Sequence, residues 1–195
     1  MIVLEKIRSH RKWKGWFLIV VAFSAFLSTG KVTNDNFFSA LKSEQSGRQT
    51  TTLSVSFLRP IDGDTSVFLI HGKEQKVRYL LIDTPETVKV GTPIQPFGLE
   101  ASTRTKELLL NAKEIQLEID QTTKYDRYGR LLAYVFVDGK LVQETLVREG
   151  LARIAFVKDN RAKYLQTLEK EQEEAKNQDL GIWSIPGYVT EKGFK

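Results

Sequence analysis

From residue 53 onward, short runs of hydrophobic residues alternate with polar ones, and this period of two predicts β-strands. Turn signals at Asp62-Gly63 and His71-Gly72 separate the first three runs and predict a meander. A later turn signal follows the fifth run at Asp138-Gly139. The five expected strands cover residues 53–58, 65–70, 75–82, 114–120 and 131–138.

Helical patterns lie between and after these strands. Residues 98–111 place Leu99, Leu108 and Leu109 among small residues, which favours one packed helical face. Further helices are expected at 141–150, with Gly150 as the stop signal, and at 161–177. Short strands with helices inserted and appended predict an α+β fold, a five-stranded, partly open OB-fold β-barrel with about three helices.

The first 30 residues contain the uncharged segment WFLIVVAFSAFLST (16–29), which follows a basic cluster. It falls within the length of a signal-peptide apolar region, about 7–15 residues, and below the ~20 residues of a spanning helix. Ser28 and Gly30 place small residues before a cleavage point ahead of Lys31. We expect residues 1–30 to be a cleaved signal peptide or, as the alternative, an uncleaved membrane anchor. Either case places the remaining chain in the secreted fraction or on the extracellular face of the membrane.

The positive charge of the chain is confined to its amino-terminal part. The net charge is +5, from 29 basic and 24 acidic residues. Residues 1–50 contain eight of the basic and three of the acidic residues, which leaves 21 of each in 51–195. The overall charge is therefore no argument for a nucleic-acid partner. Residues 31–52 are rich in Ser, Thr, Asn, Gln and Gly, which predicts a flexible polar linker.

The absence of cysteine restricts the available chemistry. It excludes disulfides, thiolate metal sites and a cysteine nucleophile, so a metal would need oxygen ligands or one of two histidines. Oxygen ligands are expected.

Two acidic motifs lie at the edges of predicted strands, IDGDT at 61–65 and DTPE at 83–86. Adjacent strands of a meander bring Asp64 and Asp83 together. Close carboxylates repel each other unless a proton or a cation intervenes. Calcium fits because it accepts irregular sets of carboxylate, water and carbonyl oxygens, and the loop beginning at Thr84 can supply a carbonyl. Each motif taken alone is also the pattern of an ordinary turn.

A third motif, KYDRYGRLLAY at 124–134, gathers basic and aromatic side chains before a strand: Lys124, Tyr125, Arg127, Tyr128 and Arg130. This combination suits phosphate binding with base stacking, and a solvated basic turn is the alternative. Arg78 lies inside an otherwise apolar strand. A buried guanidinium needs an anion, which is either a neighbouring acid or a substrate phosphate.

These stretches occur in the order IDGDT, VRYLLIDTPET and DRYGRLLAY, and with them the chain resembles the thermonuclease, or staphylococcal nuclease-like, family. GLARIAF (150–156) and LGIWS (180–184) extend the resemblance, which covers about residues 53–184 and leaves 185–195 as a C-terminal tail. The resemblance implies an OB-fold barrel with three helices and a calcium-dependent phosphodiesterase, an endonuclease that hydrolyses DNA and RNA and leaves 3′-phosphate ends.

The resemblance also assigns roles to individual residues. Asp64 and Asp83 match the family's calcium-binding carboxylates, and Thr84 matches the residue that lends its backbone carbonyl. Arg78 and Arg130 match the arginines that hold the scissile phosphate, where they would stabilise the added charge of the transition state. Glu86 matches the carboxylate beside the attacking water, which it would deprotonate or orient. Substrate-binding roles are expected for Arg127, Tyr128, Phe156 and Lys158.

Two positions depart from the family pattern. Phe156 and Lys158 stand where well-known members have a pair of tyrosines beside the nucleotide. Phe156 retains a stacking face without the hydroxyl, whereas Lys158 exchanges an aromatic ring for a charge. We expect these changes to affect base preference and terminal-phosphate recognition and to leave the acid and arginine centre intact.

The leading hypothesis is a secreted or membrane-tethered calcium-dependent nuclease, monomeric and without a protein partner. A noncatalytic OB-fold module that binds single-stranded nucleic acid or a protein at the cell surface is the alternative. The complete set of acids and arginines favours catalysis, since simple binding needs no pair of buried acids. The changes at Phe156 and Lys158 leave open a phosphodiesterase restricted to small nucleotides.

Overall fold

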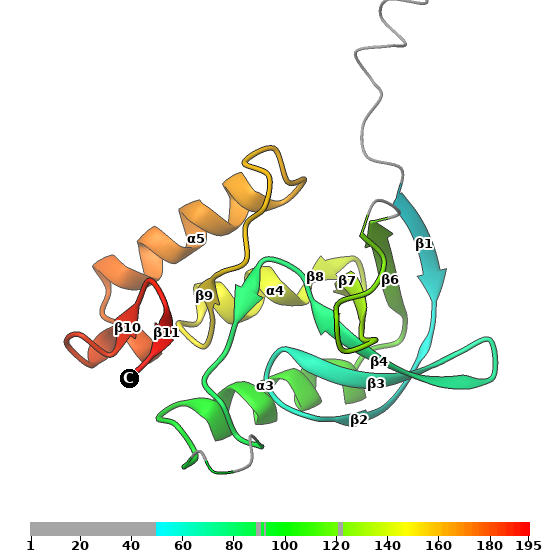
Figure 1. The fold of residues 1–195 in the computed structure, drawn as a ribbon, viewed down its shortest axis with the longest axis horizontal. Helices are drawn as coiled ribbons and strands as arrows, with labels where there is room; N and C mark the ends of the chain where they lie inside the picture. The colour runs from blue at the N-terminus through cyan, green and yellow to red at the C-terminus, as the bar shows by residue number, and fades with distance from the viewer. Residues whose placement is uncertain (1–49, 89–90, 92, 121–122) are drawn as a thin grey trace, which may run out of the picture. The chain divides into compact units, whose positions relative to one another are not determined.

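The computed structural model describes residues 50–88, 91, 93–120 and 123–195. In it, one bent strand forms both ends of the main β-sheet (Figure 1). Its halves are β1 (Thr50–Ser54) and β2 (Ser56–Pro60), separated only by Val55. β1 pairs with β6 (Ile115–Asp120), and β2 pairs with β3 (Thr65–Ile70). The strand begins at Thr50, so the predicted linker ends earlier than residue 52.

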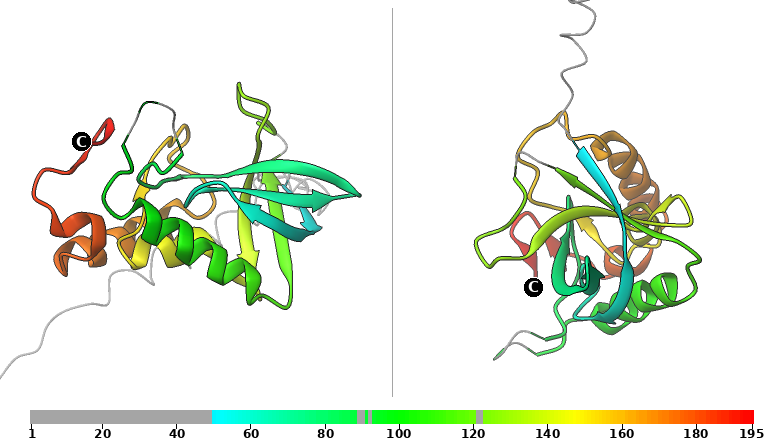
Figure 2. Two further views of the ribbon diagram at one scale, coloured as in Figure 1. Left: turned by 90° about the horizontal axis from the view of Figure 1, so that it is seen from below. Right: turned by 90° about the vertical axis from the view of Figure 1, so that its right-hand side faces the viewer.

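The sheet runs in the order β1-β6-β7-β4-β3-β2, which includes β4 (Lys73–Tyr79) and β7 (Leu131–Val137). β4 and β7 are parallel, and the other pairs along this path are antiparallel. A short strand, β8 (Lys140–Leu141), pairs antiparallel with the end of β7. Because the sheet starts and ends on one bent strand, it has to curl, as Figure 2 shows. If β1 and β2 are counted as one, five main strands remain, in agreement with the predicted α+β fold of OB type.

In the described part of the chain, three α-helices cover this sheet or pack on one another: α3 (Gly98–Leu110), α4 (Val142–Arg148) and α5 (Leu165–Asn177). α3 contacts β2, while α4 contacts both β7 and α5 (Figures 1 and 2). A short 3-10 helix, η1 (Gly181–Ser184), follows α5. The predicted start of α5 at residue 161 is wrong, because Asp159 first organises a turn in which its carbonyl accepts from Ala162 N at 3.0 Å.

The predicted strand 75–82 is interrupted, and this interruption shapes the site. β4 ends at Tyr79, Leu81 adopts a left-handed conformation with φ 66°, and β5 (Ile82–Asp83) then pairs with β9 (Arg153–Ile154). An apolar run cannot reveal this change of partner, because both segments are buried. The break moves Asp83 out of the main sheet and places it opposite Arg153.

The residues predicted to form a tail instead contain a hairpin, β10 (Val189–Thr190) and β11 (Gly193–Phe194). The chain divides into the units Met1–Gly47 and Arg48–Lys195. The predicted signal peptide or anchor and most of the predicted linker lie outside the described residues. In the ranges that are described, none of the helices has the length and apolarity needed to cross a membrane.

Candidate active site

A pocket of about 790 Å³ opens beside the ends of β4 and β5 and the loop before β7. Its lining brings together segments that are far apart in the sequence. All ten of the predicted site residues line it: Asp64, Arg78, Asp83, Thr84, Glu86, Arg127, Tyr128, Arg130, Phe156 and Lys158.

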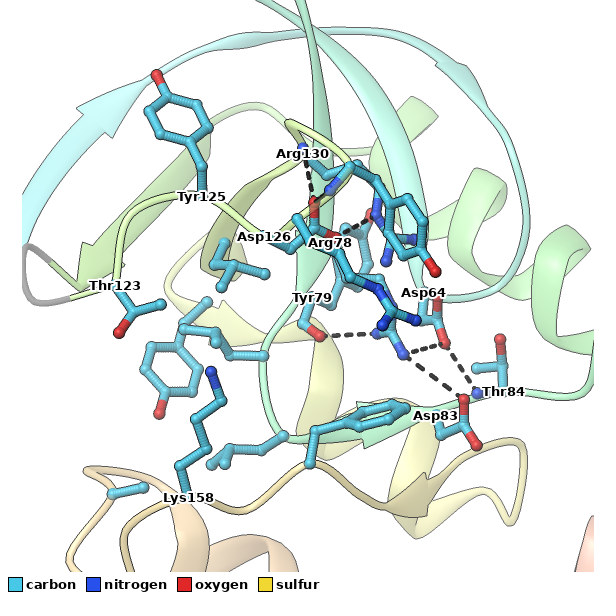
Figure 3. Close-up of a pocket in the computed structure, with 18 of the residues that line it drawn as sticks. Asp64, Arg78, Tyr79, Asp83, Thr84, Thr123, Tyr125, Asp126, Arg130 and Lys158 are labelled. Atoms are coloured by element: carbon cyan, nitrogen blue, oxygen red, sulfur yellow. Dashed lines mark hydrogen bonds and ion pairs between the residues drawn. The ribbon is translucent and has the colours of Figure 1, made fainter. Parts of the chain in front are cut away.

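Asp64 lies in the loop between β2 and β3 and is buried. Its Oδ1 accepts a hydrogen bond from Thr65 Oγ1 at 3.0 Å, and its Oδ2 accepts one from Thr84 N at 2.9 Å. Arg78 Nη2 lies 3.1 Å from the same Oδ2 (Figure 3). Asp64 thus ties its own loop to the segment after β5 and holds one side of the Arg78 guanidinium.

Asp83 lies between two arginines. Its Oδ1 is 3.6 Å from Arg78 Nη2, and its Oδ2 accepts from Arg153 Nε at 3.0 Å and from Arg153 Nη2 at 2.9 Å. Burial raises the pKa of the Asp83 carboxyl, and the charge of Asp64 adds to this effect, while Arg153 and Arg78 oppose it. The negative charge of Asp64 therefore still disfavours ionisation of Asp83, even though Arg78 and Arg153 both contact it.

Asp62 is a third acid at this end of the pocket. Burial, together with the charge of Asp64, raises its pKa to about 7. Its Oδ1 accepts from Asp64 N at 3.1 Å. Residue 63, which lies between these two acids, has to be glycine because a Cβ atom there would lie only 2.8 Å from both Ala101 Cβ and Thr84 Oγ1.

The side chains at this end of the pocket include those of the predicted calcium site. Among the described residues, no group of three or more acidic, His or Cys side chains is arranged to hold a metal. Asp64 and Asp83 nevertheless contact the same nitrogen, Arg78 Nη2, and their mutual repulsion is the kind that a divalent cation relieves. Two carboxylates, the backbone carbonyl of Thr84 and water would supply hard oxygen ligands of the kind that Ca²⁺ accepts.

Arg130 is oriented by Asp126. Arg130 Nε donates to Asp126 Oδ2 at 2.6 Å, and the backbone N–H groups of Tyr128 and Arg130 both donate to Asp126 Oδ1 at 2.9 Å. Burial alone would raise the pKa of Asp126, but these hydrogen bonds outweigh it and lower the pKa. Arg130 Nη1 also lies 3.5 Å from Thr65 Oγ1, the hydroxyl that donates to Asp64. Asp126 holds Nε, which directs the outer nitrogens of Arg130 toward the pocket.

Glu86 lines the pocket from the loop between β5 and α3. Its Oε1 accepts from the N–H groups of Thr87 at 3.0 Å and Val88 at 2.9 Å. Its backbone is paired twice with Gln95: Glu86 N donates to Gln95 Oε1 at 2.8 Å, and Gln95 N donates to Glu86 O at 3.0 Å. The loop therefore holds both the main chain and the carboxylate of Glu86.

Aromatic rings lie beside three arginines that line the pocket. The Phe156 ring, 68% exposed, has its centroid 5.4 Å from Arg78 Cζ. The Tyr128 ring, also 68% exposed, lies 4.7 Å from Arg127 Cζ and 5.6 Å from Arg130 Cζ. These exposed faces can stack on bases while the adjacent guanidinium groups face phosphates.

Lys158 occupies another part of the pocket. Figure 3 places it with Thr123, across the pocket from Asp64, Asp83 and Thr84. Lys158 therefore contributes a positive charge to the part of the pocket that lies away from these acids.

Sequence reasoning missed Asp62, Asp126 and Arg153, which contact the predicted residues Asp64, Arg130 and Asp83. Asp62 and Asp126 lie inside the quoted motifs IDGDT and DRYGR, where turn chemistry accounts for an acid. Arg153 lies in the apolar stretch GLARIAF and is 8% exposed. The signal that singled out Arg78, a cation within an apolar run, applies equally to Arg153.

Comparisons with known proteins agree with this arrangement. The family model described as "Staphylococcal nuclease homologue" matches residues 76–185. The chain is 51% identical over 149 residues to "Endonuclease YncB" of Bacillus subtilis (strain 168), a match that covers 76% of this chain and 70% of the relative. It is 42% identical over 167 residues to "Thermonuclease" of Staphylococcus hyicus, a match that covers 86% of this chain and 95% of that relative. A match to "SPbeta prophage-derived endonuclease YokF" of Bacillus subtilis (strain 168), 52% identical over 142 residues, covers 73% of this chain and 48% of that relative.

Proposed function

The chain belongs to the staphylococcal nuclease homologue family and is a thermonuclease-like nuclease, and from this premise we propose that it is a calcium-dependent extracellular nuclease. It hydrolyses phosphodiester bonds of DNA and RNA and leaves 3′-phosphate ends. One observation carries the proposal: Asp64, Arg78, Asp83, Glu86 and Arg130, from separate stretches of the chain, line one pocket.

The arginines account for binding of the scissile phosphate. Arg78 is buried and contacts Asp64 and Asp83, so it has to exchange part of this pairing to contact a phosphate. Arg130 is held at Nε by Asp126, which pre-organises its outer nitrogens. Because a guanidinium binds two phosphate oxygens in a planar geometry, the two arginines stabilise the charge that develops in the transition state.

Calcium, held by Asp64, Asp83 and the Thr84 carbonyl, would supply Lewis-acid polarisation of a phosphate oxygen. Glu86 acts on the attacking water, as a base that accepts its proton or as an acceptor that orients it. The backbone N–H groups of Thr87 and Val88 hold its Oε1 and keep the carboxylate in place.

The substrate contacts follow from the exposed rings and cations around this centre. Tyr128 and Phe156 offer stacking faces, and Arg127 and Lys158 offer charge for neighbouring phosphates. Such contacts suit single-stranded or locally opened nucleic acid, because paired bases do not present their faces. Export or membrane tethering through residues 16–29, and a monomeric state, complete the proposal.

The test is cleavage of heat-denatured DNA and of RNA by purified residues 48–195, in calcium, in magnesium and in excess chelator. Calcium-dependent cleavage that disappears in Asp64→Ala, with 3′-phosphate ends on the products, supports the proposal. Binding of the nucleic acid without cleavage in calcium would refute it in favour of the binding module. Cleavage of dinucleotides but not of long chains would refute it in favour of a small-nucleotide phosphodiesterase.

A further inference from the structure

The β10–β11 hairpin lies beyond residue 185, where the family match ends. Its two aromatic residues pack on each other: the rings of Tyr188 and Phe194 are 5.4 Å apart with an interplanar angle of 38°. Lys195 N donates to Tyr188 O at 3.1 Å, which closes the hairpin around this pair. Tyr188 is 5% exposed, so this segment is anchored on the domain.

One side of the hairpin reaches Asp83. The Phe194 ring lies 5.7 Å from Arg153 Cζ, and Arg153 binds Asp83 Oδ2 through Nε and Nη2 at 3.0 and 2.9 Å. Figure 1 shows β11 beside β9, the strand that carries Arg153. A ring over a guanidinium excludes water from it and restricts its rotamers, which strengthens the ion pair on its edge.

The other side of the hairpin reaches Glu86. Tyr188 Oη donates to Pro96 O at 2.8 Å, and the adjacent Gln95 pairs twice with the backbone of Glu86. Burial raises the pKa of Tyr188 to about 12, so the phenol stays protonated and remains a donor throughout the neutral range.

We infer that the β10–β11 hairpin is a positioning element of the active site, which orients Asp83 through Phe194 and Arg153 and orients Glu86 through Tyr188 and the loop 85–97. The inference rests on the proposed function for its catalytic consequences. Phe194, Arg153 and Tyr188 are positioning residues, because each acts through another group. The two routes end on different groups, an expected calcium ligand and an expected base, so they make separable predictions.

The test compares four point variants with the wild-type protein. Phe194→Ala removes the ring from Arg153 without changing any charge, and Phe194→Tyr restores an aromatic face. Tyr188→Phe keeps the ring pair and removes only the hydrogen bond to Pro96. Ile182→Val is the control for general loss of stability, since Ile182 is fully buried in η1.

The measurements are calorimetric titration with Ca²⁺, steady-state kcat and KM on a single-stranded oligonucleotide, and amide hydrogen exchange of peptides covering residues 82–88. Removal of a direct outer partner of a metal ligand costs about 10–100-fold in affinity. Phe194 acts one step further out, so Phe194→Ala is expected to weaken calcium binding about threefold to tenfold, and Phe194→Tyr to recover it. Tyr188→Phe is expected to lower kcat about threefold to tenfold through a misplaced Glu86, with calcium affinity unchanged.

Exchange at residues 82–84 is expected to rise in Phe194→Ala, and exchange at 86–88 to rise in Tyr188→Phe. Ile182→Val is expected to change neither. Wild-type exchange in both segments, or equal effects in Phe194→Ala, Tyr188→Phe and Ile182→Val, would overturn the inference. If the wild-type protein neither binds calcium nor cleaves, the proposed function fails, and the exchange data alone then decide whether the hairpin orients these residues.

Discussion

Replacement of Arg130 by alanine removes a guanidinium that Asp126 already holds in position through a 2.6 Å hydrogen bond. The side chain of Arg130 is 28% exposed, so its field on a phosphate is only partly screened. Two unit charges 4 Å apart interact by about 4 kcal/mol at an effective dielectric constant near 20. Loss of one pre-organised transition-state donor typically costs about 2.7–4 kcal/mol, or about 10²–10³ in kcat. We expect Arg130→Ala to lower kcat by this factor.

The stability change should be much smaller. A partly exposed ion pair contributes about 0–1 kcal/mol, and a loss of 1 kcal/mol shifts the midpoint of a domain of about 150 residues by roughly 2–4 °C. The assay is therefore kcat and KM on a fluorogenic single-stranded oligonucleotide at saturating calcium, with thermal melting of the same preparation. Arg130→Lys is the matched control: an ammonium group lacks the planar guanidinium fork, in which Nε binds Asp126 while the outer nitrogens bind a phosphate, so it should recover less than about tenfold.

A kcat for Arg130→Ala within about threefold of wild type, in a protein with the wild-type melting curve, would refute the assignment of Arg130 to transition-state stabilisation. A low kcat that Arg130→Lys restores in full would show that charge alone suffices. In that case the orientation imposed by Asp126 would have no catalytic role.

Three further predictions concern other parts of the domain. Glu86→Ser should lower kcat by about 10²–10⁴ without changing the circular dichroism spectrum; turnover near wild type would remove Glu86 from the mechanism. Because the pKa of Asp62 is raised to about 7, folding favours its protonated form, and this contribution to stability is lost as pH rises from the unfolded pKa through 7. Asp62→Asn should therefore melt at a higher temperature than wild type at pH 8 in chelator, and this difference in melting temperature should narrow toward pH 4. A difference that stays constant with pH would contradict the raised pKa of Asp62. Glu118 is buried on β6 and accepts from Lys163 Nζ at 2.9 Å and from Tyr164 Oη at 2.7 Å, so Glu118→Gln should cost about 1–3 kcal/mol in urea unfolding with kcat unchanged.

Much of the fold could be predicted because it depends on local patterns. The strand 65–70 and the helix beginning at residue 98 lie where alternation and helical periodicity place them. The turn at His71-Gly72 has φ values of 49° and 76°, as a two-residue hairpin turn of this sequence requires. The errors arose where a local pattern was ambiguous: the apolar run 75–82 turns at Leu81, and the start of α5 is delayed by the turn at Asp159.

The sequence by itself determined the alternation of strands and helices, the α+β class and the set of residues with the chemistry of the site. These properties depend on residue type and on neighbours a few positions away. Only the tertiary structure decided which groups share a partner: Arg78 contacts both Asp64 and Asp83, and Arg153 contacts Asp83 across 70 positions of sequence. Pairing and desolvation of charges depend on distances in space, because both fall steeply over a few ångströms, and sequence separation does not specify those distances. For the same reason only the fold revealed that the residues predicted as a tail form a hairpin against the active site.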